Sequence, residues 1–299
     1  MSLVSRRHFG TAGALEPGII LRPRSCVVRP FVIALSFLVA SAPIASAQGA
    51  DSLARDKTFL VRRDLGIGAA ALGATALLSR WDTDIARASQ RSRYQDSSLR
   101  KLALRVSKVN ETSLTVAGLV AYGLGRATGQ RTVTDVALHA TESVVLASVV
   151  SQLIRGPLGR SRPYVTHDSD QYDFSAGAGF KRGAAGYDHR AFPSIHTSSG
   201  MAVATVLTME MQRRHVAATP FIAPVLLAAG MLPGLSRIQL DQHWASDVLA
   251  GAVMGIFAGY KVVSYSHDHP GNAFDRVLLK ASISPDPSGG VRLGFSPSL

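Results

Sequence analysis

The sequence predicts an all-α protein, a six-helix bundle with a short C-terminal β-hairpin-like tail. The chain of 299 residues is 46% apolar and only 17% charged, which makes it richer in apolar residues and poorer in charge than most soluble proteins. Its apolar residues also gather in segments rich in Ala, Gly, Leu and Val, each long enough for one helix of a compact bundle. The six segments are residues 65–79, 112–126, 133–155, 197–212, 219–234 and 245–263.

The first residues have the features of an export signal. Arginines precede the apolar run 31–42, and Ala45-Ser46-Ala47 offers a small-x-small cleavage site. The only cysteine, Cys26, lies in this leader, so we expect the mature chain to contain neither a disulfide nor a cysteine-based site. Residues 1–47 are therefore predicted to be a signal peptide, and the protein is predicted to be exported into a bacterial cell envelope.

The chain between the leader and the tail is expected to form two helical regions. Residues 48–111 are predicted to be an N-terminal helical region and connection, in which the polar, Arg-rich segment 81–110 is read as a surface helix or connection. Residues 112–270 are predicted to be the catalytic helical core. Within this core, His139 and Glu142 are expected to be an internal polar pair on the third helix rather than a second functional site.

The tail, residues 271–299, shows the alternation of a β-hairpin. Val277, Leu279, Ala281 and Ile283 would share one face of a strand, and a second alternating stretch follows a turn-rich segment of Pro, Asp, Ser and Gly. A disordered tail is the alternative interpretation of this stretch.

The charge balance favours an anionic partner. The formal net charge is +12, and most basic residues are arginines that lie in sequence motifs or beside apolar segments. Because no basic run is interleaved with aromatic residues, nucleic acid is not expected as a partner. Phosphorylated lipid, a small phosphate ester or a membrane surface fits this pattern better, and the sequence identifies no protein partner.

One polar motif stands out near the end of the predicted core. Residues 234–247 read GLSRIQLDQHWASD, which places Arg237 six residues before His243 and Asp247 four residues after it. If a helix begins near His243, the i,i+4 spacing lets the Asp247 carboxylate hold one ring nitrogen and leaves the other free for chemistry. Taken alone, the stretch fits a helix-start histidine with a capping aspartate equally well.

Two further motifs lie upstream. Arg155 and Arg162 stand seven residues apart at the end of an apolar segment, and Pro193-Ser194-Ile195-His196 begins another. The patterns R-x6-R-P, P-S-x-H and S-R-x5-H-x3-D, in this order, resemble the three-part signature of the type 2 phosphatidic acid phosphatases, a superfamily shared with bacterial class A acid phosphatases and vanadium haloperoxidases. The resemblance covers residues 133–263 and implies a phosphatase with a helical core.

The sequence departs from the family pattern at two positions. The usual lysine of the first motif is Arg155, which keeps the positive charge but replaces a point donor with a planar fork. The usual glycine of the second motif is Ile195, whose backbone N–H still donates to phosphate but whose branched side chain is expected to narrow the pocket wall.

The resemblance implies a role for each motif residue. His243 would attack phosphorus to form a phosphohistidine, Asp247 would steady the imidazolium, and His196 would protonate the departing alcohol and then activate water. The phosphate would be bound by guanidinium groups, by a hydroxyl and by backbone N–H groups at a helix start. These phosphate-binding residues are Arg155, Arg162, Ser194, Ile195 and Arg237.

The predicted function is that of a metal-independent phosphomonoesterase or diphosphatase acting on a lipid phosphate or a related envelope ester. No metal is expected, because three guanidinium groups supply the charge neutralisation. Two alternatives remain open from the sequence: a vanadate-dependent haloperoxidase, since vanadate fits the same cradle, and a catalytically weak bundle that binds phospholipid.

The sequence fits two arrangements relative to a membrane. Most apolar segments are shorter than the roughly 20 residues that span a bilayer. If all six crossed from an exported N-terminus, the motifs would face the cytoplasm, whereas we expect the catalytic face in the periplasm. In the first arrangement one segment does not cross the membrane, and segment 65–79 is the one we expect to stay outside it. In the second, the bundle does not span the membrane at all.

Overall fold

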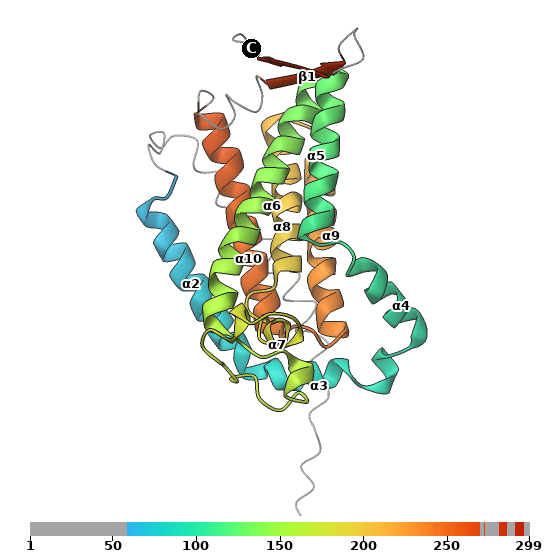
Figure 1. Ribbon diagram of the computed structural model, residues 1–299, viewed down its shortest axis with the longest axis vertical. Coiled ribbons are helices and arrows are strands. Elements are labelled where there is room, and N and C mark those ends of the chain that lie inside the picture. Colours follow the sequence, from blue (N-terminus) through green and yellow to red (C-terminus); the bar gives the residue numbers. More distant parts are fainter. Residues whose placement is uncertain (1–58, 270–271, 273–280, 286–290, 296–299) are drawn as a thin grey trace, which may run out of the picture.

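The computed structural model describes residues 59–269, residue 272 and the two strand segments 281–285 and 291–295. The predicted signal peptide, residues 1–47, lies outside the described residues. Six helices of 17 to 28 residues make up the body of the described chain, which confirms the all-α fold class (Figure 1). They are α2 (Arg62–Leu78), α5 (Glu111–Ala127), α6 (Arg131–Leu158), α8 (Ile195–Arg213), α9 (Thr219–Gln239) and α10 (Ala245–Asp268).

Each long helix coincides with one of the six apolar segments. Local signals explain several of the boundaries. Asn110 accepts a hydrogen bond from the backbone N–H of Ser113 at 2.9 Å and so caps the start of α5. Gly159, in the left-handed conformation with φ of 61°, ends α6. A Cβ atom at this position would lie 1.8 Å from the Ser175 carbonyl oxygen, so only glycine fits.

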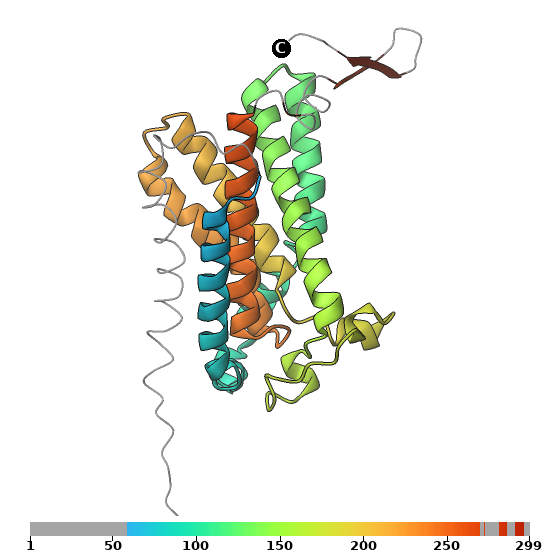
Figure 2. The ribbon, with the colours of Figure 1, turned by 90° about the vertical axis from the view of Figure 1, so that its left-hand side faces the viewer.

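Helix α8 lies at the centre of the bundle and packs against α6, α9 and α10. Helix α5 packs against α6, and α2 runs beside α10 (Figures 1 and 2). The core is built from small and medium apolar residues, among them Val144, Ala202 and Val248. A Cβ atom on Gly251 would lie only 2.3 Å from the Ser194 carbonyl oxygen, so a glycine here lets the first turns of α8 and α10 approach closely.

The connection between α2 and α5 contains two short helices, and one of its residues is buried although the sequence predicted a surface segment. It contains α3 (Asp82–Ser89) and α4 (Ser97–Val106). The prediction of a surface connection is wrong for Asp82, whose side chain is completely buried. A polar segment gives no sign of this burial, because the partners of Asp82 lie far away in the sequence.

Two short strands lie within the tail in which the sequence shows alternating apolar residues. Strand β1 (Ala281–Pro285) pairs antiparallel with β2 (Val291–Phe295), with Ile283 opposite Leu293. The pair lies at the end of the bundle opposite to α7 (Ala184–Tyr187), the short helix in the loop before α8 (Figure 1).

Three of the described helices are long and apolar enough to cross a membrane: α6, α9 and α10. Helix α2, the segment that the sequence singled out as the one that does not cross, is not among them. Large apolar side chains are nevertheless exposed on its outer face, including Leu65 and Leu72, and others are exposed on α5, α6 and α9. The bundle therefore presents apolar surface on several sides.

Candidate active site

The three sequence motifs lie together at one end of the bundle. Arg155 is in the last turn of α6, His196 is in the first turn of α8, and Arg237 is in the last turn of α9. Arg162 lies in the loop after α6, and His243 lies two residues before the start of α10. The backbone joins the motifs as well, because the N–H of Ser194 donates to the Asp247 carbonyl oxygen at 3.0 Å.

Two of the predicted phosphate-binding arginines share a backbone partner. Arg155 and Arg162 both donate to the carbonyl oxygen of Arg190, Arg162 at 3.3 Å. Arg162 also donates from Nη1 to the Gln242 carbonyl oxygen at 2.6 Å, and the same Nη1 lies 3.5 Å from Nε2 of His243. The guanidinium group of Arg162 is thus fixed directly beside the predicted nucleophile.

The third arginine is positioned by two side chains that the motifs do not include. Arg237 donates from Nη2 to the Tyr187 hydroxyl at 2.8 Å and to Gln242 Oε1 at 3.1 Å. The Tyr187 ring also lies under the guanidinium of Arg162, 4.0 Å from its central carbon to the ring centroid. Tyr187 therefore touches two of the three arginines.

The predicted nucleophile and its orienting carboxylate are both buried. His243 is 1% exposed and Asp247 is 0% exposed. Nδ1 of His243 lies 3.5 Å from Asp247 Oδ2, in ion-pair range but without the geometry of a hydrogen bond. Because Nδ1 faces the carboxylate and Nε2 faces Arg162, the nitrogen available to attack a phosphate is Nε2.

Asp247 is itself held by a buried ion-pair network. Arg160 Nη1 lies 2.5 Å from Asp247 Oδ1, and Arg160 Nη2 lies 2.8 Å from Asp82 Oδ2. Asp82 Oδ1 accepts a hydrogen bond from the Ser246 backbone N–H at 2.9 Å, and the backbone N–H of Trp244 donates to Asp247 Oδ2 at 2.8 Å. The carboxylate that faces His243 is thus fixed on both oxygens.

The start of α8 offers further donors. The N–H groups in the first turn of a helix have no intrahelical acceptor, and in α8 these include the N–H groups of Ile195 and His196. The side chain of Ser194, the residue before α8, makes no capping hydrogen bond to them. Nδ1 of His196 is also buried without a hydrogen-bond partner, as are Nε of Arg155 and Nε of Arg237. The two unpaired guanidinium N–H groups, together with the positive end of a helix, suit an anionic ligand.

Ser194 and Ile195 lie at the start of α8, and both of their side chains are buried. The Ser194 hydroxyl is buried and accepts a hydrogen bond from Thr197 Oγ1 at 2.9 Å. Ile195 is the first residue of α8, and its side chain is 3% exposed. Its backbone N–H thus lies in the first turn of the helix, while its branched side chain is part of the packed interior.

The site is strongly positive, and this shifts both histidines toward the neutral form. Burial is the largest effect that lowers the pKa of His243 well below its usual value, and the three arginines add to it. Burial followed by Arg237, Arg155 and Arg162 lowers the pKa of His196 to about 3. Without a bound anion both imidazoles are thus neutral at pH 7, as a nucleophile must be.

Sequence reasoning missed several residues of this site. Arg160 stands inside the first motif, yet it faces Asp82 and Asp247 rather than the arginine cluster. Gln242 was not among the predicted site residues either. Gln242 adjoins His243 in the sequence, and this adjacency is the only signal that could have drawn attention to it.

Comparison with known proteins shows a family similarity over the region of the motifs. Residues 136–270 match the family model of the PAP2 superfamily, and this span includes every residue of the three motifs. This match agrees with the resemblance that the motifs predicted.

The curated relatives include lipid A 1-phosphatases. That of Porphyromonas gingivalis is 38% identical over 69 residues, covering 23% of this chain and 15% of the relative. That of Rhizobium johnstonii is 26% identical over 113 residues, covering 38% of this chain and 41% of the relative. The chain thus spans less than half the length of these relatives.

Among solved structures, the chain matches a transmembrane PAP2-type phosphatidylglycerolphosphate phosphatase from Bacillus subtilis. The TM-score is 0.47 at 18% sequence identity, and the match covers 70% of this chain and 98% of that one.

Proposed function

We propose that this protein is a metal-independent phosphoric ester hydrolase that removes phosphate from a phosphorylated envelope lipid through a phosphohistidine intermediate. One observation carries the proposal. His243 is buried with Nδ1 toward Asp247 and Nε2 toward Arg162, which is the arrangement of an oriented nucleophile beside a phosphate-binding group. The match of residues 136–270 to the PAP2 superfamily supports the same class of reaction.

In the first step the phosphate group would bind to Arg155, Arg162 and Arg237 and to the free N–H groups at the start of α8. Nε2 of His243 would form a bond to phosphorus while the bond between phosphorus and the ester oxygen breaks. The leaving oxygen would take a proton from His196, and the negative charge of Asp247 would stabilise the imidazolium of His243.

The substrate itself would prepare His196 as the acid. In the free protein the arginines contribute to the low pKa of this imidazole. A bound phosphate dianion offsets their charge, so the pKa of His196 rises when the substrate binds. His196 would then hold a proton only when a phosphate group occupies the cradle.

In the second step water would attack the phosphohistidine. His196, left neutral by the first step, would accept a proton from this water, and the bond between phosphorus and His243 Nε2 would break to release inorganic phosphate. No step calls for a metal ion, because the guanidinium groups neutralise the charge on the phosphate oxygens.

A membrane lipid is the proposed substrate class. Three helices are suited to crossing a membrane, and apolar side chains are exposed on the outer faces of several helices, so the site would meet a lipid headgroup at the membrane surface. The names of the curated relatives, lipid A 1-phosphatases, favour lipid A as the lipid. Phosphatidate and phosphatidylglycerol phosphate are the lipids to compare with it.

The catalytic face is proposed to lie in the periplasm, because the leader has the features of an export signal. A reporter fused after Gly177, in the loop between the first two motifs, would test the side. Alkaline phosphatase activity is expected from this fusion, since that enzyme folds only after export. Fluorescence of a green fluorescent protein fusion without phosphatase activity would place the site in the cytoplasm and contradict the proposal.

Substitution of His196 tests the mechanism through the leaving group. His196→Ala should slow hydrolysis of a lipid phosphate by about 10²–10⁴-fold, because an alkoxide needs a proton to depart. The first step with p-nitrophenyl phosphate should slow much less, since p-nitrophenolate is a good leaving group. Rapid-quench measurement of the first turnover with both substrates reports this difference.

The control for this experiment is His167→Asn. His167 is an exposed histidine in the loop before α8 with φ of 51°, and asparagine tolerates that backbone conformation. The control should behave like the unchanged protein with both substrates. Equal slowing of the two substrates by His196→Ala would refute the role of His196 as a general acid.

A further inference from the structure

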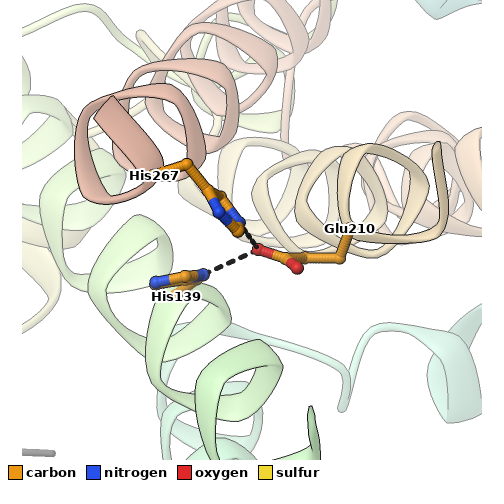
Figure 3. Close-up of side chains that lie close together, drawn as sticks. All are labelled: His139, Glu210 and His267. Carbon is orange, nitrogen blue, oxygen red and sulfur yellow. Dashed lines mark hydrogen bonds and ion pairs between the residues drawn. The ribbon is translucent and has the colours of Figure 1, made fainter. Parts of the chain in front are cut away.

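A second cluster of polar side chains lies at the other end of the helices that carry the active site. His139 of α6, Glu210 of α8 and His267 of α10 point toward one another (Figure 3). Nδ1 of His139 is 2.8 Å from Glu210 Oε1, and Nε2 of His267 is 2.9 Å from the same oxygen. The three potential ligand atoms all lie within 4.8 Å of one another.

We propose that this cluster binds a divalent transition-metal ion of the zinc class. The ligands would be His139 Nδ1, His267 Nε2 and Glu210 Oε1. Two imidazole nitrogens and one carboxylate oxygen form a donor set that zinc accepts, with a water molecule completing four-coordination. The ion would replace the two contacts that now join the imidazoles to the carboxylate.

The geometry requires only a small adjustment. Metal–ligand distances of 2.0–2.1 Å in a tetrahedron place neighbouring ligand atoms about 3.3 Å apart. The present separations from Glu210 Oε1 are 2.8 and 2.9 Å, so each imidazole would move outward by about half an ångström. The His267 side chain is 34% exposed, which gives the ion a path from solvent and leaves room for the water ligand.

The second oxygen of the carboxylate is already occupied. Arg214 Nη2 lies 3.1 Å from Glu210 Oε2 and 3.8 Å from Asp135 Oδ2. This ion pair turns Oε1 toward the two imidazoles, in the way that outer partners orient metal ligands. Asp135 offsets the positive charge of Arg214. The negative charge of Glu210 is therefore left over, and it favours a cation.

The ion would have a structural role. His139 is 16 residues before Arg155 on α6, a separation of about 24 Å along the helix axis, so the ion cannot touch a phosphate in the catalytic cradle. It would instead tie together α6, α8 and α10, the helices that carry Arg155, His196 and Asp247 at their other ends. The proposal is therefore independent of the proposed catalytic function.

Metal binding can be measured on the tag-free, full-length protein in detergent after treatment with a chelator. Titration with Zn²⁺ in a calorimeter should show one saturable site per chain, and saturation should raise the melting temperature. Co²⁺ should give the visible absorption of a four-coordinate ion. Because loss of an outer-shell partner already costs about 10–100-fold in affinity, Glu210→Gln and His267→Ala should each weaken binding by no less.

His269→Ala is the matched control, because His269 lies two residues from His267 and stacks on Tyr265 outside the cluster. It should retain full affinity and the Co²⁺ spectrum. Absence of saturable Zn²⁺ binding in the unchanged chain, or equal binding by the control and His267→Ala, would overturn the proposal. If Glu210→Gln does not fold, His267→Ala carries the test, since His267 is partly exposed and its loss removes little packing.

Discussion

His243→Ala is expected to reduce the turnover of every phosphate ester by about 10⁴-fold or more, since it removes the atom that attacks phosphorus. The loss should be the same for good and poor leaving groups, unlike that of His196→Ala. Steady-state hydrolysis of p-nitrophenyl phosphate and of a lipid phosphate measures the effect. Because His243 is buried, circular dichroism and the melting temperature must show that the variant is folded.

Asp247→Asn provides a graded comparison. The amide keeps the size of the side chain but loses the charge that steadies the imidazolium and attracts Arg160. Turnover should therefore fall less than in His243→Ala, since the nucleophilic nitrogen is still present. A folded His243→Ala variant with full activity would show that another residue attacks the phosphate.

Arg160→Met should have the largest effect on stability. It removes the partner of two buried carboxylates, Asp82 and Asp247, and breaking a buried ion pair in this way costs about 3–5 kcal/mol. Turnover should fall as well, because the carboxylate that faces His243 loses one of its anchors. Denaturant unfolding in detergent and phosphatase assays measure the two effects.

Arg87→Met is the control for that variant. Arg87 is exposed on α3, the same helix that begins with Asp82, and surface substitutions of this kind usually change stability by about 0.5 kcal/mol or less. An unfolding midpoint of Arg160→Met equal to that of the control would show that the network of Arg160, Asp82 and Asp247 contributes nothing to the fold.

The long helices could be predicted because each one is an apolar segment with polar boundaries. A helix such as α6 keeps a recognisable composition whether its neighbours are known or not, although its true end at Leu158 lies beyond the predicted 155. The central motif residues could be predicted because their spacing carries chemical meaning. His243 and Asp247 need only the i,i+4 rule to be placed together.

The supporting residues could not be predicted because their roles depend on long-range packing. Arg160 and Arg162 are two residues apart, yet one anchors Asp247 and the other lies beside His243. The turn made by Gly159 and the path of the following loop decide which arginine faces which way. Asp82 is 78 residues before Arg160, and its polar surroundings in the sequence resemble those of an exposed residue.

The phosphohistidine intermediate is tested most directly by trapping it. Protein mixed with a substrate labelled in its phosphate group and then quenched within one turnover should carry label that is stable in base and lost in acid. The label should map by peptide analysis to His243, and His243→Ala should carry none. Turnover by the unchanged protein without any trapped label, or label that survives acid on another residue, would contradict the mechanism.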